Sequence, residues 1–399
     1  MNLKKELTVR AKENAVGIRP PAFKVYKELP NGTLHIPRFF KEDTKKFTKG
    51  HNVQIQFKGI LRPHQKEALN AFNGNGVLCL PCGQGKTCTA LAIAAKMKRK
   101  TIIIVHKEFL ANQWRDRIHQ FCPGSKIGRI QGDCFDTDGE FVIAMIQTLC
   151  VRDHDPEQFS CFGMLIVDES HHIGAPAFCK TMFKVFPEFT LGLTATPDRK
   201  DGLTKLLYWF LGKQFYSMTQ STSDVNTIRI DFDHPSYRAG PILTRFGKIS
   251  MAHMVNHIVE LHERNELILM HVKNAIERNR RILILSDRRG HCEWFYDQLG
   301  DDVSGLYLGG MSEEKQEKAS QKQVIVATFS LAYEGLDIPE LDTLFLVTPH
   351  SDVKQAVGRI TRTSGTKEVY DVVDNWSVFS GMFYRRKKST EVEECLFSA

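Results

Sequence analysis

The chain has 399 residues, of which 42% are hydrophobic and 25% are charged, and its formal net charge at pH 7 is +8. This length suits two or three folded domains, and the apolar fraction excludes a disordered chain. No apolar run reaches the roughly 18–20 residues of a membrane helix. The first residues lack the apolar core of a signal peptide, so we expect a soluble intracellular protein without a membrane partner.

The basic charge is concentrated at the start of the chain. Residues 1–66 contain 15 Lys or Arg against 5 Asp or Glu, a net charge of +10, which leaves −2 for residues 67–399. Aromatic residues lie between these cations, and nucleic acid is the natural partner of such a patch. A solvated basic arm is the alternative. Residues 1–55 have little helical periodicity and contain Pro20-Pro21 and Asn31-Gly32, which predicts an accessory module of short strands and turns.

The ten cysteines are scattered along the chain. Cys79 and Cys82 form one Cys-x-x-Cys pair, but no second pair accompanies it. Free thiols are therefore expected rather than a zinc site or a disulfide framework.

Short apolar segments alternate with helical ones from residue 56 to about 220. This alternation predicts an α/β domain with a parallel sheet covered on both faces. Strands are expected at 77–80, 102–105, 141–144, 164–167 and 190–193, and helices at 87–97 and 108–121. A polar stretch at residues 219–223 is predicted to link this domain to a second one.

A glycine-rich motif, Leu-Pro-Cys-Gly-Gln-Gly-Lys-Thr, occupies residues 80–87 between the first strand and the first helix. The flexible backbone of Gly83, Gln84 and Gly85 can direct N–H groups at a triphosphate, and the following helix N-terminus favours negative charge. Lys86 is predicted to reach the β- and γ-phosphates of ATP, and the Thr87 hydroxyl to bind Mg²⁺. A tight turn with a surface lysine is the alternative.

Two carboxylates follow the apolar strand at residues 164–167. The sequence there is Asp168-Glu169-Ser170-His171, and ligands bind at the carboxyl ends of strands in open α/β sheets. Asp168 is predicted to hold the Mg²⁺, and Glu169 to polarise the attacking water. Such a pair can also simply mark where a strand meets solvent.

A second alternation predicts another α/β domain at residues 221–385. Strands are expected at 228–232, 282–285, 324–327, 343–347 and 369–373, and helices near 251–277, 289–299 and 353–358. Residues 386–399 are predicted to form a frayed tail. Arg359 and Arg362 share a helix face after Gln355, and arginines there can meet the γ-phosphate as its charge develops. An ordinary basic helix face is the alternative.

Together these motifs resemble those of superfamily 2 helicases over nearly all of residues 56–385. Leu80 replaces the first glycine of the full phosphate-loop pattern, as is common in that superfamily. The variants here are most similar to the branch that holds XPB, phage UvsW and helicases of large DNA viruses. The motifs occur in the family's order: Arg62-Pro63-His64-Gln65, the loop at 80–87, Gln113-Trp114, Asp168 to His171, Thr194-Ala195-Thr196, Thr328 with residues 334–337, and Gln355 to Arg362.

The resemblance implies two tandem RecA-like domains with ATP and Mg²⁺ in the cleft between them. The first domain would supply the loop, the two carboxylates and Gln65, which would read the adenine edge. The second would supply Arg359, Arg362 and Gln355, which would position the attacking water. Residues that would line the strand channel or couple it to the ATP site are Gln147, Thr148, Thr194, Thr196, Arg199 and Thr328.

The resemblance further implies an ATP-dependent helicase or translocase, and DNA is the expected substrate, whether single-stranded, duplex or forked. RNA is the alternative substrate. The protein would act as a monomer or within a larger complex, in the cytoplasm or nucleus, and a viral origin would place it in the host cell or virion. A motor subunit of a restriction or transcript-release complex stays open as another function. A binding module with an inactive motor is disfavoured because Lys86, Asp168, Glu169 and Arg362 are all present.

Overall fold

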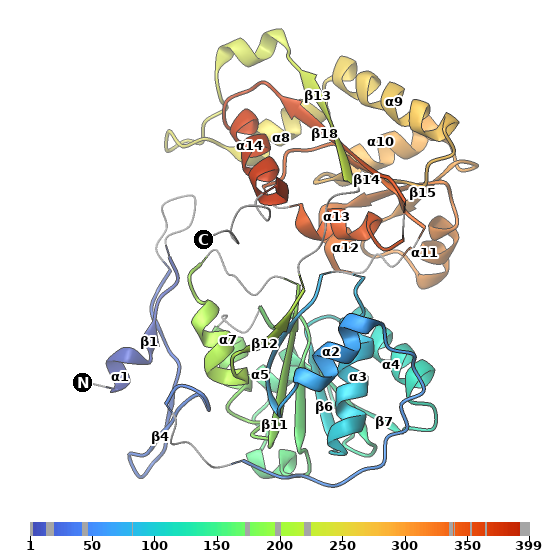
Figure 1. Ribbon diagram of the computed structural model, residues 1–399. Coiled ribbons are helices and arrows are strands. Elements are labelled where there is room, and N and C mark those ends of the chain that lie inside the picture. The colour runs from blue at the N-terminus through green and yellow to red at the C-terminus, as the bar shows by residue number, and fades with distance from the viewer. Residues whose placement is uncertain are drawn as a thin grey trace, which may run out of the picture. The chain divides into compact units, whose positions relative to one another are not determined.

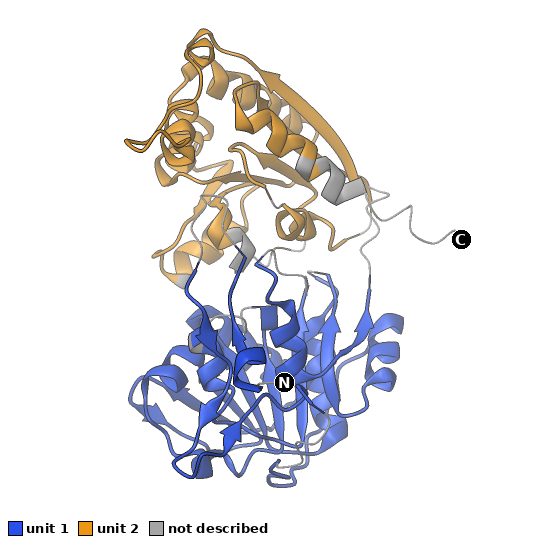
Figure 2. Cartoon of the chain, turned by 90° about the vertical axis from the view of Figure 1, so that its left-hand side faces the viewer, with its two compact units in different colours: residues 1–219 blue, residues 220–399 orange. Residues whose placement is uncertain are grey.

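The computed structural model describes residues 3–12, 20–41, 47–81, 83–171, 176–195, 201–218, 225–334, 338, 340–351, 353–363 and 365–391. The chain divides into two compact units, residues 1–219 and 220–399 (Figures 1 and 2). Within the described residues, no helix is both long enough and apolar enough to cross a membrane.

Unit 1 is built on an eight-stranded sheet with the order β12-β5-β11-β10-β6-β9-β7-β8. Neighbouring strands are parallel except at the β7–β8 edge. The inner strands are buried on both faces, which is why they read as continuous apolar runs in the sequence. The strands are β5 (Asn75–Cys79), β6 (Thr101–Val105), β7 (Ile127–Gln131), β8 (Cys134–Phe135), β9 (Phe141–Met145), β10 (Met164–Val167), β11 (Phe189–Thr194) and β12 (Gln214–Ser217).

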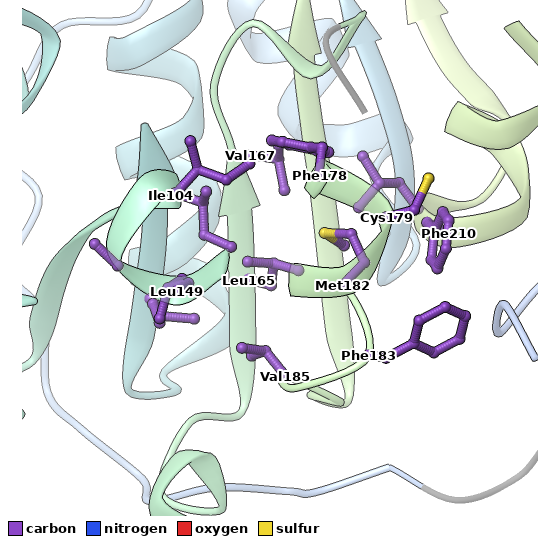
Figure 3. Packing of buried hydrophobic residues seen from close by; sticks show 14 of the residues in the cluster. Ile104, Leu149, Leu165, Val167, Phe178, Cys179, Met182, Phe183, Val185 and Phe210 are labelled. Atoms are coloured by element: carbon purple, nitrogen blue, oxygen red, sulfur yellow. The ribbon is translucent and has the colours of Figure 1, made fainter. Parts of the chain in front are cut away.

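Helices cover both faces of this sheet. Alternate residues of β10 point to opposite faces, so Leu165 and Val167 join one apolar cluster and Met164 and Ile166 the other. The first cluster is shown in Figure 3, where Val167 lies beside Phe178 and Leu165 lies beside Met182. That face carries α5 (Ile146–Val151), α6 (Pro176–Thr181) and α7 (Thr204–Leu211), and the other carries α2 (Pro63–Ala71), α3 (Lys86–Met97) and α4 (Glu108–Phe121).

The N-terminal segment contains the short strands that the sequence predicts. Two antiparallel pairs form, β1 (Thr8–Val9) with β2 (Phe23–Lys24) and β3 (Lys27–Glu28) with β4 (Leu34–His35), after the short helix α1 (Leu3–Glu6). Val9 and Val25 are buried in the first apolar cluster of the sheet. The Thr48 hydroxyl donates to the carbonyl oxygen of Phe162 at 2.9 Å. This segment therefore shares the core of unit 1.

Unit 2 contains a six-stranded, wholly parallel sheet with the order β13-β18-β17-β14-β16-β15. One face packs against α9 and α10, and the other against α12 and α13. The strands are β13 (Val225–Phe232), β14 (Ile282–Ser286), β15 (Ser304–Tyr307), β16 (Val324–Thr328), β17 (Thr343–Leu346) and β18 (Lys367–Asp374). The helices are α8 (Met251–Val259), α9 (His262–Glu277), α10 (Arg289–Leu299), α11 (Glu313–Ser320), α12 (Phe329–Glu334), α13 (Lys354–Ile360) and α14 (Val378–Glu391).

The helix predicted near residues 251–277 is in fact two helices. Leu261 has an extended backbone, with φ −74° and ψ 111°, which separates α8 from α9. The Asn265 side chain donates to the carbonyl of Val259 at 2.8 Å across this break. The apolar periodicity continues through both helices, so hydrophobic pattern alone could not reveal the interruption.

The prediction of a frayed tail from residue 386 is wrong at its start. Arg386 lies in α14 and is only 3% exposed. Its guanidinium forms two bonds with the Asp371 carboxylate, at 2.7 and 2.8 Å, and donates to the carbonyl of His350 at 2.8 Å. A run of four basic residues looks solvated in sequence, but the buried Asp371 supplies a partner that no local pattern indicates.

Candidate nucleotide site

The loop between β5 and α3 has the backbone shape that its glycines predict. Gly83 and Gly85 both have φ of +77°, in the left-handed region that side chains disfavour. A Cβ on Gly85 would also lie 2.1 Å from Nε2 of Gln65, so a larger residue there would displace the Gln65 amide. The backbone conformation of the loop therefore favours glycine at position 85.

The N-terminus of α3 fits an anion. Its N-cap residue is Gly85, which offers no side chain to cap the first N–H groups. The ammonium group of Lys86 lies across the loop, where it donates to the carbonyl of Leu80 at 3.2 Å. Uncapped N–H groups beside a half-buried cation are what a triphosphate needs, so these residues fit ATP.

Gln65 supports this loop directly. Its side chain is 3% exposed, and Nε2 donates to the carbonyls of Gln84 and Gly85 at 3.4 and 3.3 Å. Its Oε1 accepts a bond from the backbone N–H of Arg62 at 2.7 Å. Gln65 thus joins the start of α2 to the phosphate loop, a contact that the sequence did not indicate.

Asp168 directly follows β10, the strand between β6 and β11. Trp114 on α4 donates its indole N–H to Oδ2 at 2.9 Å, and the backbone N–H of Glu169 donates to Oδ1 at 3.0 Å. Burial, and then the charge of Glu169, raise the pKa of Asp168 to about 6, against the opposing effects of the Trp114 bond and the Lys86 charge. The structure therefore brings Asp168 within electrostatic reach of the phosphate loop.

The raised pKa of Asp168 predicts a pH-dependent cost to stability in the nucleotide-free protein. The folded-state pKa lies above the ordinary value of 3.8, so the folded protein disfavours the ionised form of Asp168. The free energy of unfolding therefore decreases as this carboxyl ionises, between about pH 4 and above pH 6. We expect Asp168→Asn to gain stability relative to wild type across that window. Chemical denaturation of both proteins at several pH values measures the difference, and a difference independent of pH would contradict the prediction.

Glu169 adopts a backbone conformation that is unusual for a non-glycine residue, with φ of +46°. Its Oε2 lies 3.3 Å from Nδ1 of His171, and the same nitrogen lies 3.4 Å from the hydroxyl of Thr194 at the end of β11. These contacts link the second carboxylate to the neighbouring strand. They offer a physical connection between the nucleotide site and the segment predicted to couple it to strand separation.

Mg²⁺ prefers carboxylate, hydroxyl and phosphate oxygens and keeps several waters. Thr87 and Asp168 offer such oxygens at this sheet edge. Across the described part of the chain, no group of three or more His, Cys, Asp or Glu residues could hold a metal by itself.

The other predicted residues lie in several places. Exposed Gln147 donates to the carbonyl of His106 at 2.7 Å, at the carboxyl end of β6. Thr148 is buried, and its hydroxyl accepts the N–H of Gly132 at 2.9 Å. Thr328 ends β16 in unit 2, with its hydroxyl 3.3 Å from that of Ser330. Thr196 and Arg199 lie outside the described residues.

Gln355 and Arg359 lie on α13, and Arg362 follows its end. All three side chains are half-buried in unit 2. Their meeting with a phosphate held by unit 1 stays a prediction.

Trp114 is the site residue whose role the sequence missed. The Gln113-Trp114 motif indicates no role for the indole, because the bond to Asp168 joins residues 54 positions apart. The signal available in the sequence is a tryptophan within an amphipathic helix, because a buried indole N–H needs an acceptor. In the structure Trp114 is 1% exposed.

We expect Trp114→Phe to weaken ATP hydrolysis at limiting Mg²⁺ by roughly 10- to 100-fold, as for a lost hydrogen bond to a charged group. Phenylalanine fills most of the same space but leaves Oδ2 of Asp168 without its donor. Mg²⁺ titrations of ATPase activity and of nucleotide binding measure the effect. Trp294→Phe, on α10 of unit 2, is the matched control. An unchanged Mg²⁺ dependence would show that Trp114 is only a packing residue.

Comparison with known proteins agrees with this geometry. Residues 58–199 match the family model described as type III restriction enzyme, res subunit. A protein of Acanthamoeba polyphaga mimivirus, provisionally named an ATP-dependent RNA helicase, is 32% identical over 401 residues, covering 93% of this chain and 76% of that protein. A provisionally named helicase of Invertebrate iridescent virus 6 is 28% identical over 400 residues, covering 91% of this chain and 89% of that protein.

A solved structure shows the same fold. The helicase domain of Pyrococcus furiosus Hef matches with a TM-score of 0.54 at 14% identity, covering 82% of this chain and 98% of that domain. The predicted architecture of helix-covered parallel sheets is thereby confirmed. With its ordered motifs, its phosphate loop and its viral relatives, this chain belongs to the superfamily 2 helicases, alongside helicases of large DNA viruses.

Proposed function

We propose that this helicase hydrolyses ATP at the site described in unit 1 and uses the energy to move along DNA and separate its strands. The observation that carries the proposal is the convergence of Lys86, Asp168 and Glu169 at one edge of the unit 1 sheet. The ammonium group of Lys86 lies beside the phosphate loop at the N-terminus of α3, and its positive charge favours the ionised form of Asp168.

Each residue has a distinct role in the proposed reaction. Lys86 and the loop N–H groups bind the β- and γ-phosphates. Thr87 and Asp168 would hold Mg²⁺, which would neutralise phosphate charge when bound. Glu169 orients the attacking water, and Nδ1 of His171 lies 3.3 Å from its Oε2.

The proposed reaction also needs the second unit. Arg359 and Arg362 would approach the γ-phosphate from unit 2, and Gln355 would help to position the water. Because neither unit alone holds all of these groups, hydrolysis would require closure of one unit on the other. Closure would couple the state of the nucleotide to the grip on the strand.

DNA and RNA are the two candidate substrates of the proposed motor. The resemblance to the branch holding XPB and UvsW favours DNA. The provisional names of the mimivirus protein and of its African swine fever virus counterpart, 24% identical over 359 residues (81% of this chain, 69% of that protein), favour RNA as the second candidate. Phosphate contacts by the basic N-terminal segment would serve either polymer, because they carry no sequence information.

The deciding experiment measures ATPase activity with single-stranded DNA, duplex DNA, forked DNA and RNA side by side. We expect the largest stimulation with DNA. If RNA alone stimulates hydrolysis, the substrate is RNA and not DNA. If none of the four nucleic acids stimulates hydrolysis, the proposed motor function is wrong.

Lys86→Ala is expected to lower this ATPase activity by at least about 10²-fold while nucleic-acid binding is kept. The substitution removes the cation that grips the phosphates and leaves the rest of the sheet edge in place. Lys96→Ala, on the exposed face near the other end of α3, is the matched control. Near-normal hydrolysis by folded Lys86→Ala protein would exclude this loop as the nucleotide site.

A further inference from the structure

A β-hairpin at residues 241–250 projects from unit 2 between β13 and α8, as the yellow-green loop of Figure 1 and the matching loop of Figure 2 show. Leu243 and Ile249 pair across it, and the Thr244 N–H donates to the carbonyl of Lys248 at 2.6 Å. Gly247, with φ of +70°, donates its N–H to the carbonyl of Thr244 at 2.9 Å and closes the tip. Residues 244–248 therefore form a defined tip rather than an irregular loop.

The base of the hairpin is fixed to the body of unit 2. Ile242 packs against the apolar cluster that includes Tyr237 and Trp376. The Trp376 indole donates to the carbonyl of Gly240 at 2.9 Å, and the Ser250 N–H donates to the carbonyl of Ile242 at 2.7 Å. These contacts anchor the base of the hairpin, and binding elements are most precise when they are supported by rigid structure.

The hairpin carries an unusual share of exposed apolar side chains. Nine large hydrophobic residues are exposed within the described part of the chain, and four of them lie in or next to this hairpin. Phe246 at the tip is 74% exposed. Apolar groups gathered in one exposed place mark a surface that binds something. The four residues are Leu243, Phe246, Ile249 and Met251.

The charge of the hairpin region favours an anionic partner. Residues 220–399 contain 22 Lys or Arg and 26 Asp or Glu, a net charge of −4, yet residues 234–259 hold three cations and no acidic residue. Two of these cations, Arg245 and Lys248, flank Phe246. The Arg245 guanidinium lies 4.7 Å from the centre of the Phe246 ring, so it covers part of that ring. The surface suits a partner with negative charge and flat apolar faces.

We propose that this hairpin binds single-stranded DNA, with Phe246 stacked on an unpaired base and with Arg245 and Lys248 on the flanking phosphates. Aromatic stacking combined with backbone cations is the way proteins hold single strands without reading their sequence. The inference rests on the proposed DNA motor and adds a contact that none of the helicase motifs contains.

The test uses the full chain and two fluorescent oligonucleotides, one with normal bases and one abasic over its central residues. Phe246→Ala should weaken binding to the normal oligonucleotide on the order of tenfold and leave binding to the abasic one nearly unchanged. Phe246→Trp should restore binding to the normal strand. Met270→Ala, which shortens an exposed side chain on α9 of the same unit, should change neither.

Salt dependence tests the cations separately. Arg245→Gln should reduce the slope of log affinity against log salt by about 0.7, the contribution of one phosphate contact on a single strand.

Equal weakening of both oligonucleotides by Phe246→Ala, or no weakening of either, overturns the stacking assignment even when DNA stimulates the wild-type ATPase. Loss of binding to phosphatidylserine vesicles without loss of DNA binding would assign the hairpin to membranes instead. Wild-type protein that neither binds nor responds to nucleic acid would overturn the proposed function itself.

Discussion

Arg362→Ala is expected to lower the turnover of ATP by about 10³–10⁵-fold, the range for arginines that meet a transferring phosphate. The residue lies in unit 2, just beyond α13, while Lys86 lies in unit 1. The negative charge on the γ-phosphate grows in the transition state, so an arginine placed for that state acts mainly on turnover. ATP affinity should therefore fall much less than turnover.

Single-turnover hydrolysis and equilibrium binding of a fluorescent ATP analogue separate these two quantities. Arg289→Ala is the matched control, because Arg289 is a surface arginine of the same unit paired with Glu293 at 3.0 Å. Turnover within a few-fold of wild type in Arg362→Ala would reject the two-unit site and favour a self-contained ATPase in unit 1.

Glu169→Gln is expected to allow ATP binding but to slow hydrolysis by about 10²–10⁴-fold, the usual contribution of a general base. Glutamine keeps the size of the side chain and loses the charge that orients and polarises water. Nδ1 of His171 lies 3.3 Å from its Oε2, and the same approach distance is open to a glutamine side chain. The variant should therefore trap ATP in the site.

Rapid-quench hydrolysis and retention of radiolabelled ATP on the protein measure this effect. Glu188→Gln is the matched control, because Glu188 lies beside the start of β11, at the opposite edge of the same sheet, and pairs with Arg99 at 3.2 Å. If Glu169→Gln hydrolyses ATP nearly as fast as wild type, another group must activate the water.

The sequence by itself determined the features that depend on neighbouring residues. Continuous apolar runs such as residues 164–167 predicted strands buried on both faces, and β10 has those bounds. The 14-residue helix α4 also has its predicted bounds. Gly83, Gly85 and Lys86 stand in the order of a phosphate loop, and their backbone geometry follows from the residue types. Local chemistry sufficed in each case because the interacting groups are close in sequence.

Only the tertiary structure decided which distant side chains meet. The bond between Trp114 and Asp168, the support of the loop by Gln65 and the burial of Arg386 against Asp371 each join segments that folding brings together. The burial that raises the pKa of Asp168 is likewise a property of the packed sheet. The sequence does not distinguish a basic or aromatic residue that is exposed to solvent from one that contacts a buried carboxylate. Its environment is set by elements that are distant along the chain.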